Sequence, residues 1–258
     1  VHLANAPLIR VLAQVRFPPI LKIREEAFIA DFQEYIRKDY PRPLRDVVQG
    51  IDLAVSNDQQ IRYERNEAIL WRFFDRENIT RVSLGTDFIS MEVASYQSRQ
   101  AFLARMKNIL SALSETIEPS EAHRVGFRYV SRVGGDGLSD ELPLLIRESL
   151  LGAVGPHARG SVRYSMTEVH SDTLEGQLAA RIGLLSPGQT HDPNVAPPVD
   201  DWSWIMDIDG SSRPEAEAFD PHELIAELEK CAGRAYSFFR WSVKDLFLEK
   251  FGRATDEN

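Results

Sequence analysis

Hydrophobic and polar residues alternate along a segment near the start of the chain, residues 8–17. Successive side chains of a β-strand point to opposite faces, so this alternation predicts a strand with one packed face and one polar face. The polar face carries Arg10, Gln14 and Arg16. The apolar face carries Ile9, Val11, Ala13, Val15 and Phe17.

The same pattern returns far along the chain, in residues 124–133. Here Arg124, Arg128 and Arg132 share one face, opposite the apolar residues Val125, Phe127, Tyr129 and Val133. Because the two segments share one design, we expect them to be equivalent strands of a duplicated fold, with their arginines on one shared surface. We predict that this surface is the binding site. Its residues are Arg10, Gln14, Arg16, Arg124, Arg128 and Arg132.

The rest of the chain divides into helical and strand-like segments. Helical periodicity predicts helices at 25–38, at 98–116 with Ser98 as N-cap, at 142–151, and at 221–251 between the cap Asp220 and the stop Gly252. Strand-like runs lie near 51–55, 69–74, 80–84, 88–94, 162–170, 177–185 and 202–209. A stretch with four prolines, 186–201, predicts either a mobile hairpin connection or a partner-binding loop.

The order strand, helix, several strands, helix therefore occurs twice. It predicts an α+β protein of two pseudo-repeats, 1–120 and 121–258, fused into one domain. This layout resembles the TATA-binding-protein fold, a curved antiparallel sheet with helices on one face, in which the first strands of the two repeats are central neighbours. The alternative is a single irregular α+β sheet.

Composition narrows the possible partners. The 258 residues carry a net charge of −9, so binding of nucleic acid requires a local positive face. A single cysteine permits no internal disulfide, and Cys231 keeps the phase of a helix core. No apolar stretch approaches the roughly 18 residues of a membrane span, and the start shows no signal-peptide pattern. We therefore expect a cytoplasmic protein that does not bind membranes.

Several short motifs resemble a sporadically distributed bacterial family that has no assigned activity. The most specific is the opening, Asn5-Ala6-Pro7-Leu8 followed by Gln14-Val15-Arg16-Phe17-Pro18-Pro19. Others are Thr86-Asp87-Phe88-Ile89-Ser90 with Tyr96 and Ser98-Arg99, Gly126-Phe127-Arg128-Tyr129, Trp204-Ile205-Met206-Asp207-Ile208-Asp209 and Phe239-Arg240-Trp241-Ser242. The resemblance spans nearly the whole chain and implies one intact domain, without catalytic residues or a cofactor.

The arginine surface can be interpreted in two ways. Arginine offers planar donors that suit phosphate and carboxylate, which indicates a binding face for nucleic acid or for an acidic protein partner. Alternatively, the surface is a solvated sheet face whose arginines pair with cross-strand acids such as Glu92, Glu168, Asp207 and Asp209.

Two further features suggest other chemistry. Asp207 and Asp209 lie two residues apart on one strand face and could hold a hard cation, which gives the alternative of a metal-dependent phosphate-cleaving enzyme. Aromatic residues on more than one face of the last helix predict core packing or, through Trp241 and Phe251, a homodimer contact. Our main expectation is a non-enzymatic binding module without a cofactor, acting in a bacterial regulatory or defence system.

Overall fold

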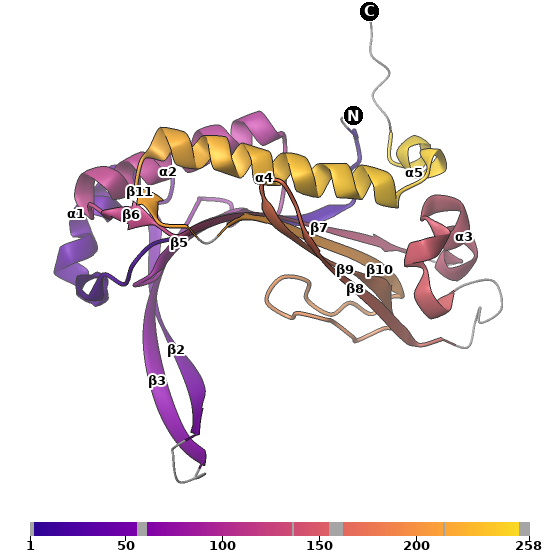
Figure 1. Cartoon of the computed structure of the whole chain (residues 1–258), viewed down its shortest axis with the longest axis horizontal. Helices are drawn as coiled ribbons and strands as arrows, with labels where there is room; N and C mark the ends of the chain where they lie inside the picture. Colours follow the sequence, from indigo (N-terminus) through magenta and orange to yellow (C-terminus); the bar gives the residue numbers. More distant parts are fainter. Residues whose placement is uncertain (1–2, 56–60, 136, 155–161, 214, 253–258) are drawn as a thin grey trace, which may run out of the picture.

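The alternating segments of the chain join into one antiparallel sheet (Figure 1). The computed structural model describes residues 3–55, 61–135, 137–154, 162–213 and 215–252. Within them the sheet has nine strands in the order β2-β3-β4-β5-β1-β7-β10-β9-β8. The strands are β1 (Leu8–Arg16), β2 (Arg42–Val55), β3 (Ile61–Phe74), β4 (Thr80–Leu84), β5 (Phe88–Val93), β7 (Arg124–Gly134), β8 (Tyr164–Asp172), β9 (Gly176–Leu185) and β10 (Ser203–Ser212). Two short strands, β6 (Glu121–Ala122) and β11 (Glu217–Ala218), form a separate pair.

The two halves of the chain build the sheet in the same way. The first half starts at the centre with β1, moves to the edge strand β2, and returns inward through β3, β4 and β5. The second half starts at the centre with β7, moves to the opposite edge strand β8, and returns through β9 and β10. The two first strands, β1 and β7, are antiparallel neighbours. The predicted α+β class with duplicated units is confirmed, and the first strands adjoin at the centre as the TATA-binding-protein-like layout requires.

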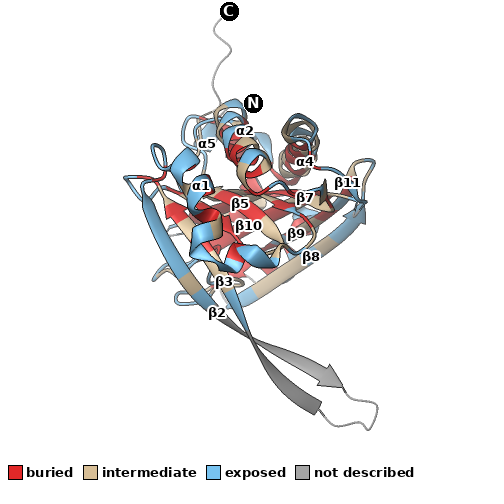
Figure 2. Cartoon of the chain, turned by 90° about the vertical axis from the view of Figure 1, so that its left-hand side faces the viewer, coloured by how far each residue is buried: buried red, intermediate tan, exposed pale blue. Residues whose placement is uncertain are grey.

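The two long helices lie side by side across one face of the sheet (Figures 1 and 2). The helices are α1 (Glu26–Ile36), α2 (Arg99–Thr116), α3 (Leu138–Leu145), α4 (Pro221–Ser242) and α5 (Asp245–Lys250), with 3₁₀ turns η1 (Leu21–Arg24), η2 (Glu148–Leu150) and η3 (Gly152–Val154). Figure 2 shows the buried residues concentrated between the sheet and the helices α2 and α4. The sheet face turned away from these helices is the underside.

The predicted alternation of β1 holds for all but its first residues. Val11, Ala13 and Val15 are buried in the core beneath the helices. The register with β7 shifts between Leu8 and Arg10, and this irregularity reverses the phase of the strand at its start. As a result, Leu8 packs against the core and Ile9 packs on the underside against a small cluster that includes Val130 and Ile205. The prediction that Ile9 shares the face of Val11 is therefore wrong.

The predicted caps hold, but the last helix is divided. The Ser98 hydroxyl accepts a hydrogen bond from the Ala101 amide at 3.1 Å, and the Asp220 carboxylate accepts one from the His222 amide at 2.7 Å. α4 ends at Ser242 because Val243 is extended and forms a β-bridge with Ile146. Backbone pairing with a distant segment therefore interrupts a sequence whose local pattern is helical.

Three other boundaries differ from the prediction. The helix expected at 142–151 is replaced by α3, η2 and η3, since Ile146 is extended in order to pair with Val243. The strands expected at 51–55 and 69–74 are parts of the longer strands β2 and β3. Long hairpins tolerate polar residues, and these hide strand character from a search for apolar runs.

The helix α4 lies unusually close to the sheet at one glycine. A Cβ atom on Gly210 of β10 would lie 2.6 Å from the carbonyl oxygen of Cys231 in α4. Cys231 is buried, and its burial raises the pKa of its thiol to about 12, as expected for a core cysteine.

None of the helices in the described residues is long and apolar enough to cross a membrane.

Replacing Gly210 with Ala should destabilise the protein by about 1–3 kcal/mol, because the backbone of α4 has to move to admit the new methyl group. Gly126→Ala is the matched control. It lies on the adjacent strand and faces the underside, where the nearest atom to a new Cβ is 3.5 Å away. Urea unfolding followed by circular dichroism measures both variants, and equal losses would contradict the close approach.

Candidate functional site

The structure brings all of the predicted site residues to the underside. In an antiparallel pair, directly opposite residues share a face. Arg16 lies opposite Arg124, Gln14 opposite Gly126, and Arg10 opposite Val130. On the other side of β7, Val130 lies opposite Asp207 and Arg128 lies opposite Asp209. Arg132 follows two residues after Val130 on the same strand face, so six binding candidates and two carboxylates occupy one surface.

Arg128 and Asp207 form a buried ion pair at the centre of this surface. Nε of Arg128 donates to one carboxylate oxygen of Asp207 and a terminal nitrogen donates to the other, each at 2.6 Å. Nε2 of His191 lies 2.7 Å from the second oxygen. The side chains of Asp207 and His191 are each only 3% exposed. Both oxygens of Asp207 are therefore engaged within the protein.

The two carboxylates on β10 differ in their electrostatic surroundings. Burial opposes the ionised form of Asp207, but hydrogen bonds from Arg128 and His191 outweigh burial and hold the pKa of Asp207 below its usual value. Burial raises the pKa of Asp209, although Arg124 lies 3.7 Å from its carboxylate. Folding thus lowers the pKa of Asp207 and raises that of Asp209, although both lie on the same strand face.

The proline-containing loop 186–201 covers part of the underside (Figure 1). Val195 and Ala196 are buried against the sheet beside Ile205, and Arg132 donates to the carbonyl oxygen of Pro197 at 2.5 Å. The Asp192 carboxylate lies 3.4 Å from Arg128. The loop is therefore a packed cover over the arginine surface. As predicted, the loop is a hairpin connection, since it joins the antiparallel neighbours β9 and β10. Two buried side chains and turn hydrogen bonds, such as the one from the Gly188 amide to the Val199 carbonyl oxygen, hold it against the sheet, and its mobility stays a prediction.

The arginines of the underside pair with the acids that the second interpretation named. Glu92 bridges Arg10 and Arg81, and its contact with Arg81 is 2.7 Å. Arg181 and Glu168 are 2.9 Å apart. Together with the pairs on Asp207 and Asp209, these contacts distribute both signs of charge along the sheet. The surface is a mixed-charge face, which differs from a uniformly basic stripe.

One pair of arginines keeps accessible donors. Arg16 and Arg124 are direct cross-strand partners on the two central strands. Their side chains are 49% and 37% exposed, and their nearest acids, Asp87 and Asp209, lie 3.8 and 3.7 Å away. Gln14 lies one row further along, opposite Gly126, which has no side chain to fill the space. This end of the underside can accept an anion.

The metal-dependent alternative gains no support from the geometry. Asp207 would have to release Arg128 or His191 before it could bind a cation. Among the described residues, no three His, Cys, Asp or Glu side chains are grouped so that they could hold a metal ion. The pair Asp207 and Asp209 therefore serves the charge pairing of the sheet.

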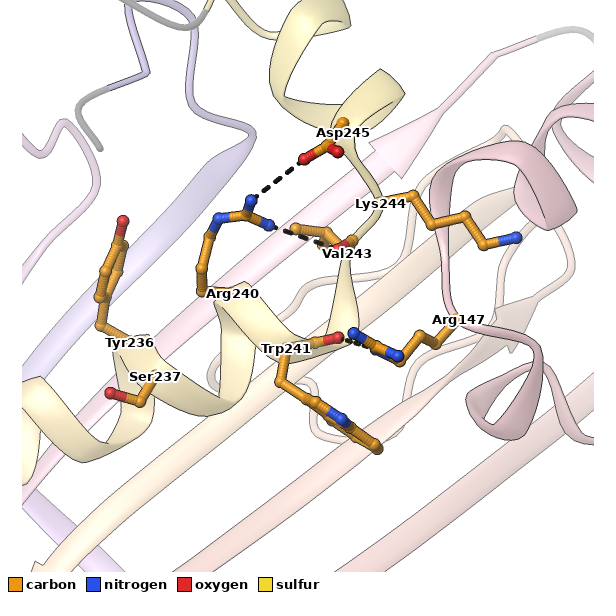
Figure 3. Close-up of a pocket in the computed structure, with 8 residues that line it drawn as sticks. All are labelled: Arg147, Tyr236, Ser237, Arg240, Trp241, Val243, Lys244 and Asp245. Carbon is orange, nitrogen blue, oxygen red and sulfur yellow. Dashed lines mark hydrogen bonds and ion pairs between the residues drawn. The ribbon is translucent and has the colours of Figure 1, made fainter.

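A hollow of about 690 Å³ lies at the end of α4 (Figure 3). Its cations are engaged: Arg240 pairs with Asp245 at 3.1 Å, and Arg147 donates to the carbonyl oxygen of Trp241. The Arg147 guanidinium also lies over the Trp241 ring, at 5.3 Å from the ring centre. These contacts fix the break between α4 and α5, so we interpret the hollow as a structural joint.

The predicted homodimer contact involved Trp241 and Phe251. Phe251 packs on Phe247 of its own chain, with ring centres 4.6 Å apart. Trp241 is 44% exposed and contacts Phe238 and Arg147. A dimer through Trp241 therefore stays a prediction. Phe251 instead packs against the core of its own chain.

The sequence interpretation missed His191 and Asp192 as parts of the arginine network. Both lie in the irregular loop, where no periodicity tells which residues return to the sheet. A charge argument could have suggested them, since a half-buried arginine next to a buried aspartate requires additional polar partners. The partners of Arg10 and Arg124 could be predicted from the sequence, because Glu92 and Asp209 lie in segments with a recognisable strand pattern.

No protein-family model matches this chain, and a search of curated proteins finds no significant match. The resemblance to a bacterial family therefore stays a prediction, which rests on the motifs quoted above.

Replacing Asp207 with Asn should reduce the free energy of unfolding at pH 7 by about 2–3 kcal/mol, since the half-buried Arg128 loses its two-point carboxylate partner and keeps only the more distant Asp192, at 3.4 Å. Asp209→Asn should change it by no more than about 0.5 kcal/mol, because burial opposes the charged form of Asp209 and offsets what its contact with Arg124 contributes. Urea unfolding measures both variants.

The same pair of variants tests the pH dependence. The folded-state pKa of Asp207 lies below the unfolded value of about 3.9, so its stabilisation is complete above about pH 4 and is lost as the pH falls through the folded pKa. The gap between wild type and Asp207→Asn should therefore close in acid. A gap that is unchanged at pH 3 would contradict the ion pair.

Proposed function

We propose that the protein is a non-enzymatic binding module that holds an acidic segment of a protein partner at Arg16 and Arg124. The observation that carries this proposal is the direct cross-strand pairing of these two half-exposed arginines. Like charges opposite each other destabilise a sheet. A carboxylate placed between them relieves this repulsion and gains charge-assisted hydrogen bonds.

The remaining arginines of the predicted set form the support for this site. Arg128 and Arg132 are held by Asp207 and by the loop 186–201. Arg10 is held by Glu92. These internal pairs fix the central strands without occupying Arg16 and Arg124, so the binding end of the underside is preorganised.

The distribution of charge favours a protein over nucleic acid. Binding of a phosphate backbone gains its free energy by neutralising several phosphates with unpaired cations. On the underside, Asp87, Asp209 and Glu92 lie among the arginines and would repel successive phosphates. A folded partner or a peptide can instead place its own basic residues against these acids, and this complementarity gives specificity.

The contacts of the loop 186–201 show which groups satisfy arginines on this surface. The loop offers Arg128 a carboxylate and offers Arg132 a backbone carbonyl oxygen. Both groups are present in any acidic peptide. The same chemistry at Arg16 and Arg124 supports an acidic segment as the ligand.

The test compares the double variant Arg16→Gln/Arg124→Gln with Arg76→Gln/Arg181→Gln. Both double variants remove two exposed positive charges. In the second pair, Arg76 follows β3, and Arg181 lies on β9, which β10 separates from the Arg124 strand β7. Each tagged chain is expressed in the native host and isolated at low salt, and companion proteins are quantified by mass spectrometry. We expect a stoichiometric companion with wild type and with the control, and at least a tenfold loss with Arg16→Gln/Arg124→Gln.

A thermal melt of each variant accompanies the experiment. The melting temperature of Arg16→Gln/Arg124→Gln should equal or exceed that of wild type, because a like-charge pair is removed. Equal retention of the companion by all three chains would refute the site. Titration with a labelled 20-nucleotide single strand provides the contrasting case: if the wild-type chain retains no protein companion and this variant loses affinity for the strand, the ligand is nucleic acid.

A further inference from the structure

A second pocket lies on the opposite face of the sheet, beneath the helices. Its volume is about 500 Å³, within the range of small-molecule sites. Its floor is formed by Leu8, Tyr129 and Ile208 of the three adjacent strands β1, β7 and β10. Its walls come from the segment before β1, the turn before α2, and the second half of α4. It is separate from the underside and independent of the function proposed above.

The lining of this pocket is mostly apolar and aromatic. Tyr96 and Tyr129 pack edge to face, with ring centres 6.0 Å apart, and Phe239 of α4 adds a third ring. Burial is the main cause that raises the pKa of Tyr96, so its hydroxyl stays a neutral hydrogen-bonding group. An apolar body with a planar ring suits such walls.

Among the described residues, one cation meets this apolar lining. Arg99 lines the pocket, while none of the other described residues that line it is charged. The Arg99 guanidinium lies over the ring of Tyr236, at 5.7 Å from its centre. Its Nε is buried without a hydrogen-bond partner, and within the part of the chain that the structure describes Arg99 forms no ion pair.

The position of Arg99 increases the need for an anion. It is the first residue of α2, where the positive end of the helix dipole disfavours a cation and favours an anion. An anionic group beside Arg99 would satisfy both the guanidinium and the helix terminus. The Arg99 Nε that has no partner and the apolar lining are two independent observations that lead to one class of ligand.

Residues distant in the sequence meet at this pocket. Ala6 and Pro7, Tyr96 and Arg99, Tyr129, Ile208 and Phe239 come from five separate segments. These are five of the segments singled out above by their motifs, and the proposed function on the underside leaves these lining residues without a role. They leave a pocket open to solvent, rimmed by exposed residues such as Ala6 and Ser98, although most of its lining is apolar.

We propose that this pocket binds a small organic anion with an apolar body, whose charged group meets Arg99 and whose body lies between Tyr96, Tyr129 and Phe239. The site takes one molecule per chain. The preferred ligand carries a single negative charge, because Arg99 is the one charged residue among the described residues of the lining.

Two fluorescent probes with nearly the same rings test the proposal. 8-Anilinonaphthalene-1-sulfonate carries a negative charge, and N-phenyl-1-naphthylamine is its neutral counterpart. We expect both to bind the wild-type chain with a stoichiometry of one. Arg99→Gln should weaken the sulfonate by about tenfold, the contribution of a hydrogen-bonded charge pair, and leave the neutral probe within about twofold. Arg99→Lys should restore part of the affinity for the sulfonate.

Two further variants locate the site. Arg147→Gln is the matched control, because Arg147 lies over Trp241 in the other hollow as Arg99 lies over Tyr236. It should leave both affinities unchanged. Ala6→Phe should fill the pocket and abolish binding of both probes, and a thermal melt confirms that the variant is folded.

Three outcomes would overturn the proposal. The first is that neither probe binds the folded wild-type chain at 1:1 stoichiometry. The second is that the sulfonate binds equally well to wild type and Arg99→Gln, which would make the pocket apolar without anion preference. The third is binding that survives in folded Ala6→Phe, which would place the probes elsewhere. Displacement of the sulfonate by decanoate, by an aromatic carboxylate or by inorganic phosphate then distinguishes the kinds of anion.

Discussion

The antiparallel pairing of β1 with β7 is the contact on which the rest of the structure depends. It joins two half-sheets, each built outward from its own first strand, into one surface of nine strands. Without it, each half would expose a strand edge and the apolar residues beneath its helix. The pairing also decides which side chains meet, because the register that buries Val11 and Val15 places Arg16 opposite Arg124.

This register explains why the two faces of the sheet have different chemistry. The face toward α2 and α4 is desolvated, so it consists mostly of apolar residues, and a pocket lies where the two halves and the start of the chain meet. The underside is only partly covered by the loop 186–201, and there each arginine near the cover requires a partner. Local desolvation thus determines which arginines form ion pairs or hydrogen bonds within the protein and which remain exposed to solvent.

Much of the fold could be predicted from the sequence, because its signals are local. The alternation of β1 and β7, the caps at Ser98 and Asp220, and the duplicated order of elements each depend on neighbouring residues. What could not be predicted depends on distant partners: the break at Val243, paired with Ile146, and the reversal at Ile9. For the site, strand alternation placed all six residues on one face. It could not show that the loop 186–201 returns to that face, since an irregular segment has no period.

The two edges of the sheet limit how other chains can associate with it. The edge strand β2 carries Arg42, Pro43 and Arg45, and the opposite edge strand β8 carries Glu168, His170 and Asp172. Proline lacks the amide that an added strand would need, and opposite ends of the sheet bear charged side chains that must be desolvated on pairing. Growth by strand addition, the route to fibrils and to extended sheets between subunits, is therefore disfavoured here. We therefore expect other chains to contact this sheet through its two faces and not through its edge strands.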